Sequence, residues 1–223
     1  MTNIFLVFGY GIPKNILKDE NYNFYLKTVF NKIYGVVTKD TYTKPLIIFC
    51  GGKTDIFKPY KRNEAEEMRK FFTAMINQRP FLKSITKNWL FIVEKESLST
   101  LENLINSEKI LEKRKIKKAN VFIFCEQTRE KRVKLFAKKI YNKNHRIQIM
   151  PVDFDVSANR YLAPKFLAKK EKAELKHCLW ALQSPENLRK HHESFKEKIK
   201  GFRKAGPKIH LQAIQKRWER NIA

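Results

Sequence analysis

The chain has 223 residues, of which 43% are hydrophobic and 13% aromatic, a composition that is typical of a globular protein and excludes an intrinsically disordered one. A formal net charge of +25 favours partners that are polyanions, namely nucleic acid, acidic membrane surfaces or phosphorylated ligands. A solvated basic surface without a specific partner is the alternative, because net charge by itself argues for solubility and non-specific association.

The predicted elements of the first half are short apolar strands separated by helices. In chain order they are a strand over 3–8, a helix over 21–34, a strand over 45–50, a helix over 63–78 and a strand over 90–93. Gly9 and Gly11 end the first strand as a G-x-G, which lacks the third glycine of a dinucleotide fingerprint. Gly35 is the predicted stop of the first helix. Gly51 and Gly52 end the second strand, where the backbone turns sharply or approaches a ligand closely.

The second half continues the same alternation and then becomes helical and basic. Its predicted elements are a helix over 100–113, a strand over 120–125, a helix over 133–140, a strand over 146–150 that ends at Pro151, and helices over 165–183, 184–205 and 209–220. Ser184 and Pro185 suit the cap and the first turn of the second-last helix. The positive charge is spread over the whole chain and is densest in residues 156–223.

This alternation predicts an α/β fold, a three-layer, doubly wound and mostly parallel five-stranded sheet with a C-terminal helical extension. We expect residues 1–155 to form the core domain and residues 156–223 to pack on it as a basic helical extension. In such sheets ligands bind outside the carboxyl ends of the strands. Four polar clusters follow strands and should meet at that edge: Gly9 with Gly11, Gly51 with Gly52, Glu96 to Asn103, and Glu126 to Arg132.

The most informative of these clusters is the strand-to-helix turn that begins at Glu96. Ser99 is a predicted N-cap, and Glu102, three residues on, completes a capping box. Capping explains the presence of those two residues, but it does not explain the other polar residues of the turn, which are therefore candidates for a functional role. The residues left over are Glu96, Ser97, Thr100 and Asn103.

Together the clusters resemble the YdcF/SanA/ElyC-like family, catalogued as a domain of unknown function, over about residues 3–153. The resemblance rests on the double glycine Gly51-Gly52 after a strand, Glu64-Ala65 opening the next helix, Glu96-Ser-x-Ser-Thr-x-Glu-Asn103, and Arg129-x-x-Arg132 after a later strand. It implies a doubly wound α/β core. It also implies two functional expectations: some members are tied to bacterial envelope maintenance, and S-adenosylmethionine binding has been suggested for the family.

Three departures from the family pattern change what the resemblance implies. Cys50 precedes the double glycine where Ser is usual. Arg129 stands where the pattern has His, so a fixed cation replaces a neutral proton acceptor, which puts His-based acid–base chemistry in doubt. Many envelope members carry a membrane anchor, whereas we expect none here because no segment of the sequence approaches the ~18 apolar residues of a membrane span, so an envelope role is less favoured.

Arg129 and Arg132 lie three residues apart at a predicted helix start, where guanidinium and backbone N–H groups bind phosphate or carboxylate. The alternative is salt bridging with Glu126, Glu130 or Glu96. The carboxylates of Glu64, Glu96 and Glu126 are predicted to meet at the same edge. They would bind ligand hydroxyls or a cation, or act as a general base, with Glu64 and Glu96 the catalytic candidates; otherwise they are partners of the arginines and helix N-termini.

The histidines match no zinc-binding spacing, so we expect no metal site and interpret them as surface residues. Cys50, Cys125 and Cys178 form an odd set without paired spacing, which fits a reducing compartment better than a disulfide scaffold. Cys50 and Cys125 end apolar strands and are predicted to be buried, although a thiol beside arginines would also suit a nucleophile. Without a signal-peptide pattern or a membrane span, the chain is expected to be a soluble, cytoplasmic protein.

Three functional hypotheses follow. The first is binding of a small anionic ligand, nucleotide-like, S-adenosylmethionine-like or phosphorylated, at the carboxyl edge of the sheet. The residues predicted to bind it are Gly9, Gly11, Gly51, Gly52, Glu64, Glu96, Ser97, Thr100, Asn103, Glu126, Arg129 and Arg132. The second is nucleic-acid or acidic-surface binding by residues 156–223, without a recognisable motif. The third is a hydrolase acting on phosphorylated envelope intermediates.

Overall fold

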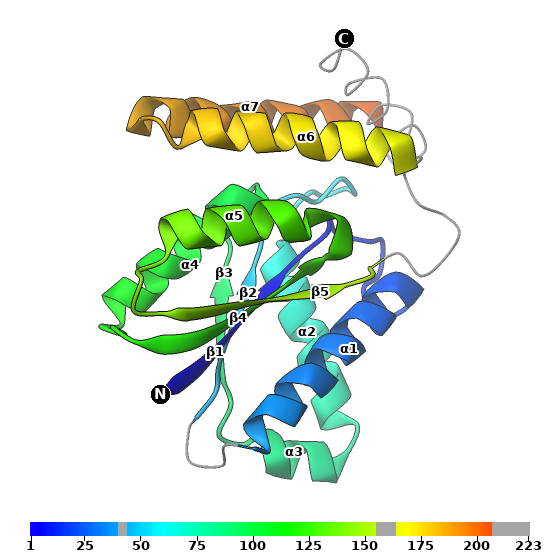
Figure 1. Ribbon diagram of the computed structural model, residues 1–223. Coiled ribbons are helices and arrows are strands. Elements are labelled where there is room, and N and C mark those ends of the chain that lie inside the picture. Colours follow the sequence, from blue (N-terminus) through cyan, green and yellow to red (C-terminus); the bar gives the residue numbers. More distant parts are fainter. Residues whose placement is uncertain (40–43, 155–163, 207–223) are drawn as a thin grey trace.

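The computed structural model describes residues 1–39, 44–154 and 164–206 and contains a five-stranded parallel sheet in the order β3-β2-β1-β4-β5 (Figure 1). The predicted α/β class is confirmed, and each strand pairing is parallel. The strands are β1 (Thr2–Phe8), β2 (Leu46–Cys50), β3 (Leu90–Glu94), β4 (Ala119–Glu126) and β5 (Arg146–Val152). The helices are α1 (Glu20–Val37), α2 (Glu64–Asn77), α3 (Pro80–Thr86), α4 (Thr100–Lys113), the 3₁₀ turn η1 (Gln127–Arg129), α5 (Glu130–Ile140), α6 (Pro164–Ala181) and α7 (Pro185–Ala205).

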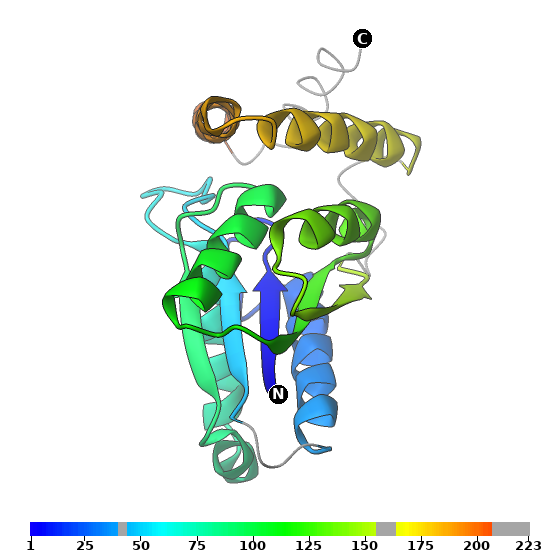
Figure 2. The same cartoon turned by 60° about the vertical axis from the view of Figure 1, so that its left-hand side comes forward.

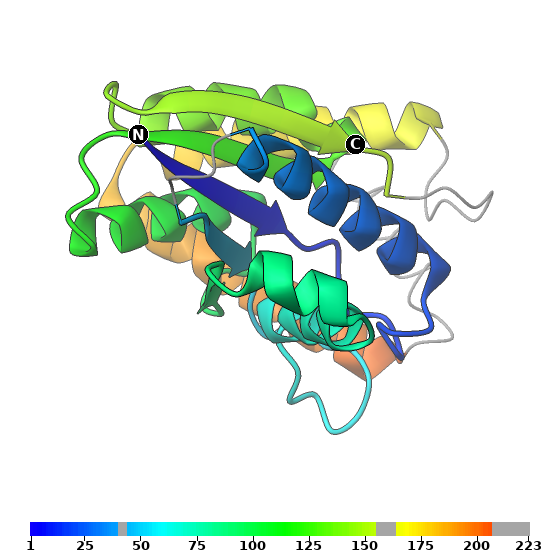
Figure 3. The same ribbon diagram turned by 90° about the horizontal axis from the view of Figure 1, so that it is seen from below.

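The sheet is covered on both faces, which explains why its strands are continuously apolar. Alternate side chains of β1 enter two separate cores: Phe5 and Val7 pack with α1 and α2, whereas Leu6 and Phe8 pack with α4 and α5. Figure 3 shows α1 and α2 together on one side of the strands. The apolar runs of the sequence are therefore the inside of a three-layer structure.

Two predicted boundaries are wrong and one helix was missed, each for an identifiable reason. Helix α1 continues through Gly35, because Val36 and Val37 still pack on the core and the Thr38 N–H bonds to Tyr34 O. Helix α3 was missed because it has seven residues and starts at Pro80, which is tolerated at a helix N-terminus. Strand β5 includes Pro151, since β5 is an edge strand, where proline is acceptable.

The order of the strands creates a crevice at the centre of the sheet. The chain builds β1, β2 and β3 outward in one direction, then crosses to place β4 on the other side of β1. The loops after β1 and β4 consequently diverge, and ligands bind at such a point in doubly wound folds. The predicted polar clusters of Gly9 and Arg129 flank this crevice.

Helices α6 and α7 lie side by side across the carboxyl ends of the strands (Figures 1 and 2). Ser184 caps α7 by accepting a hydrogen bond from the Asn187 N–H, as predicted. The short helix predicted over 209–220 lies outside the described residues. In the described part of the chain, no helix is both long and apolar enough to cross a membrane.

Candidate functional site

A cavity of about 490 Å³ lies between the carboxyl edge of the sheet and the α6–α7 hairpin. This volume is within the range of small-molecule sites. Eight of the sequence-predicted residues line it: Gly9, Gly11, Glu64, Ser97, Thr100, Asn103, Arg129 and Arg132. The hairpin adds groups that were not predicted for this edge of the sheet, above all Lys170, Glu174 and Lys198, of which the two lysines were candidates for nucleic-acid binding.

The glycines make room for other parts of the protein. A Cβ on Gly9 or on Gly51 would lie 2.5 Å from Glu64 Oε2, and a Cβ on Gly52 would lie 2.7 Å from the carbonyl oxygen of Ser97. Gly51 also has a φ of +146°, which side chains rarely adopt. Gly51 and Gly52 do not line the cavity. Their close approach is to Glu64 and to the β3–α4 turn, not to a ligand.

Glu64 is buried, lines the cavity and lies in the first turn of α2. Its Oε1 accepts hydrogen bonds from the Gly11 N–H at 2.6 Å and the Thr54 hydroxyl at 2.8 Å. Burial raises the pKa of this carboxyl, while the Thr54 bond and the nearby Arg129 charge oppose the rise. A carboxyl group with a raised pKa in a cavity is suited to exchange a proton or to bind hydroxyl groups.

Arg129 lies at the end of η1 and lines the cavity. One of its terminal nitrogens donates to Gly9 O at 3.3 Å and to the Thr100 hydroxyl at 3.4 Å. Its guanidinium carbon lies 4.4 Å from the centre of the Tyr10 ring, and its Nε is buried without a hydrogen-bond partner. None of these partners carries a negative charge.

Arg132 differs, because its charge is already paired. It contacts Glu171 at 2.9 Å and Glu174 at 3.4 Å, both from α6. The sequence offered Glu126, Glu130 or Glu96 as its partners, and α6 supplies others. Arg132 therefore attaches the C-terminal extension to the core.

The start of α4 forms one wall of the cavity. Ser97, Thr100 and Asn103 line it, and Asn103 Oδ1 is buried without a hydrogen-bond partner. The turn is held by Glu94, which sequence reasoning missed: its Oε1 accepts from the N–H groups of Glu96 at 2.9 Å and of Ser97 at 3.1 Å. Burial raises the pKa of the Glu94 carboxyl, and the hydrogen bonds from Ser97 and its neighbours oppose that rise. A carboxylate at the end of a strand, two residues before a polar turn, is the signal that would have identified it.

Two predicted site residues lie elsewhere. Glu96 is exposed, and it does not line the cavity. Glu126 is buried and caps η1, because its Oε2 accepts from the Thr128 N–H at 2.9 Å and from the Thr128 hydroxyl. Of the three predicted carboxylates, Glu64 is the one that reaches the cavity.

The thiols do not contribute to the cavity either. Cys50 and Cys125 are fully buried, as predicted, and neither lines it. Burial raises the pKa of Cys50 well above its usual range and that of Cys125 to about 12. Thiols that stay protonated are poor nucleophiles. Across the described segments, no group of three or more His, Cys, Asp or Glu residues is arranged to hold a metal ion.

The hairpin is docked on the α4 start by two histidines. His191 Nε2 lies 2.9 Å from Ser99 Oγ, and His192 Nδ1 lies 3.0 Å from Glu102 Oε1. Ser99 caps α4 as predicted, but the Glu102 carboxylate accepts from the Leu98 N–H rather than from Ser99. The interpretation of the histidines as surface residues is wrong for His191 and for His145, which are both buried.

His191 is expected to make folding stability pH-dependent. Burial, followed by the neighbouring His177, lowers its pKa to about 4 from 6.5. Between about pH 4 and pH 6.5 this histidine is therefore protonated in the unfolded chain but neutral in the folded protein. The free energy of unfolding consequently falls as the pH drops from about 6.5 to about 4. The loss is up to roughly 3 kcal/mol. Denaturant unfolding across this range checks it: His191→Gln should flatten the fall, and an equally steep profile in the variant would contradict the assignment.

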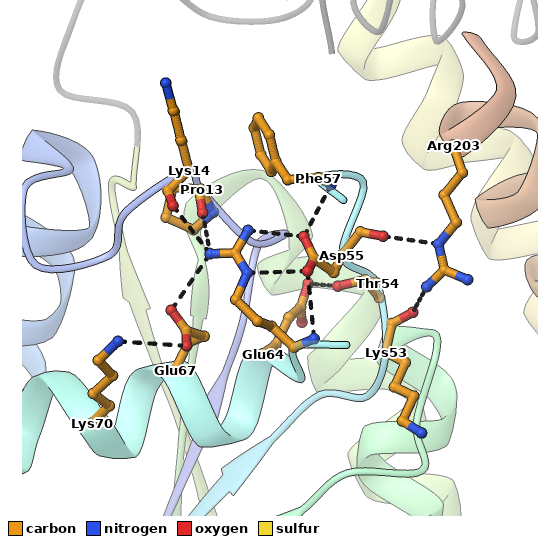
Figure 4. Close-up of polar contacts among 11 residues, drawn as sticks. Pro13, Lys14, Lys53, Thr54, Asp55, Phe57, Glu64, Glu67, Lys70 and Arg203 are labelled. Carbon is orange, nitrogen blue, oxygen red and sulfur yellow. Dashed lines mark hydrogen bonds and ion pairs between the residues drawn. The ribbon is translucent and has the colours of Figure 1, made fainter. Parts of the chain in front are cut away.

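A buried ion pair shapes the loop between β2 and α2 (Figure 4). Asp55 is fully buried, and both its oxygens accept from Arg62, at 2.8 and 3.0 Å. Arg62 also donates to the carbonyl oxygen of Pro13 at 2.8 Å. From α7, Arg203 donates to the carbonyl oxygens of Lys53 and Asp55. This network fixes the loops after β1 and β2 and joins both to the hairpin.

Comparison with protein-family models, with curated proteins and with solved structures finds no match to this chain.

Proposed function

We propose that the protein binds a small anionic molecule in the cavity beneath the α6–α7 hairpin, with Arg129 as the principal anion-binding group. One observation carries the proposal: among the described residues Arg129 forms no ion pair, although it is half-buried and lines the cavity. A guanidinium without a carboxylate partner in such a place is stabilised by an anionic ligand. Arg132, which is paired with α6, has a structural role in this proposal.

The identity of the ligand is narrowed by the family resemblance and by the volume. S-adenosylmethionine, nucleotides and sugar phosphates all fall in the size range of a 490 Å³ cavity. Each combines an acidic group with hydroxyl groups. Arg129 suits the acidic group, and Glu64 suits the hydroxyls.

Calorimetry with these three ligand classes tests the proposal. Arg129→Gln keeps a polar side chain but removes the charge, and it should weaken binding by about tenfold or more, since a charge-assisted hydrogen bond contributes roughly 1.5–3 kcal/mol. Arg189→Gln is the matched control, because Arg189 is exposed on α7. A ligand that binds equally well to the Arg129 variant, or a panel without any binder, would contradict the proposal.

Hydrolysis of a phosphorylated compound is the second candidate function, and the position of Glu64 favours it. Its carboxyl lines the cavity, has a raised pKa and lies near Arg129, as a general acid or base beside an anion site would. Glu96, the other candidate, is exposed. Glu64→Gln should lower turnover of a phosphorylated substrate at least a hundredfold, in line with typical acid–base contributions. Unchanged turnover in that variant would remove the candidate.

Nucleic-acid binding by the hairpin has less support from the charges on α7. Three of its lysines form ion pairs with glutamates one turn away: Lys190 with Glu186, Lys196 with Glu193, and Lys200 with Glu197. These pairs reduce the net charge that this face of α7 offers to a phosphate backbone.

A further inference from the structure

A cluster of charged side chains lies where α6 covers the core, and it carries more positive than negative charge. Glu174, which is 4% exposed, is contacted by Arg132 at 3.4 Å and by Lys198 at 3.8 Å. Lys170 and Arg129 act on it electrostatically. The carboxylates of the cluster are Glu171 and Glu174, so the cations outnumber them even before Lys198 is counted.

The pKa values of the cluster report the same excess. The pKa of Lys170 is lowered to about 8, first by burial and then by repulsion from Arg129 and Lys198. Burial alone would raise the pKa of Glu174, yet the surrounding cations bring it down to about 2. Cations therefore outnumber carboxylates in this cluster, which borders the cavity.

Two buried polar atoms beside the cluster have no partner. Arg129 Nε is a donor that lacks an acceptor, and Asn103 Oδ1 is an acceptor that lacks a donor. Asn103 is 4% exposed and lines the cavity. Buried polar groups in native proteins are almost always paired, so a ligand with both kinds of group would complete this site. The N-terminus of the 14-residue helix α4, which borders the cavity at Thr100, adds a partial positive charge on the same side.

Glu64 provides a further acceptor. Its Oε1 is occupied by Gly11 and Thr54, whereas Oε2 has no hydrogen-bond partner within the described residues. Asn103 and Glu64 thus offer two acceptors next to a cationic cluster. Hydroxyl groups are the ligand groups that donate to such acceptors.

We propose that the ligand of this cavity is a phosphorylated polyhydroxy compound that carries a ribose phosphate or a similar sugar phosphate. Its phosphoryl group binds between Arg129, Lys170 and Lys198, and its hydroxyl groups donate to Asn103 Oδ1 and Glu64 Oε2. This inference rests on the proposed anion-binding function and makes it specific: a dianionic phosphate is favoured over a carboxylate because two cations, Arg129 and Lys170, form no ion pair with a described residue.

Calorimetry on the full chain with inorganic phosphate, ribose, ribose 5-phosphate and AMP tests phosphate binding and hydroxyl binding separately. Ribose 5-phosphate should bind at least tenfold more tightly than either inorganic phosphate or ribose. Tighter binding of AMP than of ribose 5-phosphate would identify a nucleotide as the source of the ribose phosphate, and the reverse order a free sugar phosphate; both support the inference.

Substitutions test which residues bind the phosphoryl group and which bind the hydroxyl groups. Lys170→Gln should weaken the binding of ribose 5-phosphate at least tenfold. Lys172 is exposed on the same helix, so Lys172→Gln should leave this affinity unchanged. Asn103→Ala should weaken the binding of ribose 5-phosphate but not the binding of inorganic phosphate. Equal weakening of both ligands would overturn the assignment of the hydroxyls, and wild-type binding in Lys170→Gln would overturn that of the phosphate.

Failure of this inference is distinguishable from failure of the proposed function. If S-adenosylmethionine, whose acidic group is a carboxylate, binds in an Arg129-dependent manner while the phosphorylated probes do not, the inference is wrong and the anion-binding function stands. If no anionic probe binds, both are wrong.

Discussion

Replacement of Gly52 by alanine is expected to destabilise the protein by about 3 kcal/mol, the upper part of the range for overpacking. The added methyl group would lie 2.7 Å from Ser97 O and 2.8 Å from Lys95 O. Both are backbone atoms, which cannot rotate away as a side chain does. Gly52 also donates to Ser97 O and accepts from the Glu64 N–H, so any shift breaks the contacts between the β2–α2 and β3–α4 turns.

Chemical denaturation of Gly52→Ala measures this effect, and Gly201→Ala is the matched control. Gly201 lies within α7 and has nothing within 4 Å of the position of an added Cβ. There alanine should stabilise the helix by roughly 0.5–1 kcal/mol. Similar stabilities of the two variants would show that the turn at Gly52 opens without cost, contrary to the close contacts.

Replacement of Arg132 by leucine is expected to destabilise the protein by about 3–5 kcal/mol, the usual cost of removing one partner of a buried charge pair. Glu174 would lose a partner in a place where it is 4% exposed, and Glu171 would lose its contact at 2.9 Å. Because Arg132 belongs to α5 and both glutamates to α6, the damage should concentrate at the hairpin. We expect faster hydrogen exchange in α6 and α7 than in β1 and β4.

Thermal unfolding and hydrogen exchange check this prediction, with Lys131→Leu, an exposed neighbour, as the control. The double variant Arg132→Leu/Glu174→Leu should recover part of the loss, since it removes a buried charge that the single variant leaves unpaired. A double variant that is less stable than Arg132→Leu would contradict this account. Hairpin exchange that does not change in Arg132→Leu would show that the His191 and Arg203 contacts suffice to dock α6 and α7.

Sequence reasoning brought eight of the residues that line the cavity together, because parallel sheets bring the ends of their strands to one edge. Gly9, Glu64, Thr100 and Arg129 are far apart in the chain, and the strand–helix alternation was enough to place them together. It was less successful with the carboxylates. Glu96 and Glu126 were both predicted to follow strands, but Glu96 is exposed and Glu126 caps η1. Hydrophobic periodicity does not predict this difference in side-chain direction.

The contribution of the hairpin was not visible in the sequence. Lys170, Glu174 and Lys198 are ordinary members of a basic, helical stretch, and nothing in their spacing distinguishes them from neighbours that are exposed. Their importance comes from the docking of α6 and α7 over the carboxyl edge, which buries Glu174 among cations. Likewise, His191 became a buried contact of Ser99 only through that docking.

The sequence by itself determined the α/β class, the identity of the five strands and the edge at which polar residues gather, because these follow from local hydrophobic periodicity and from the geometry of parallel sheets. The tertiary structure alone decided which of the two predicted arginines is paired with carboxylates. Arg132 is paired with α6 and Arg129 is not, and that difference depends on contacts between residues about forty positions apart in the chain. Pairing between residues so far apart is determined by packing in three dimensions, which local patterns in the sequence do not predict.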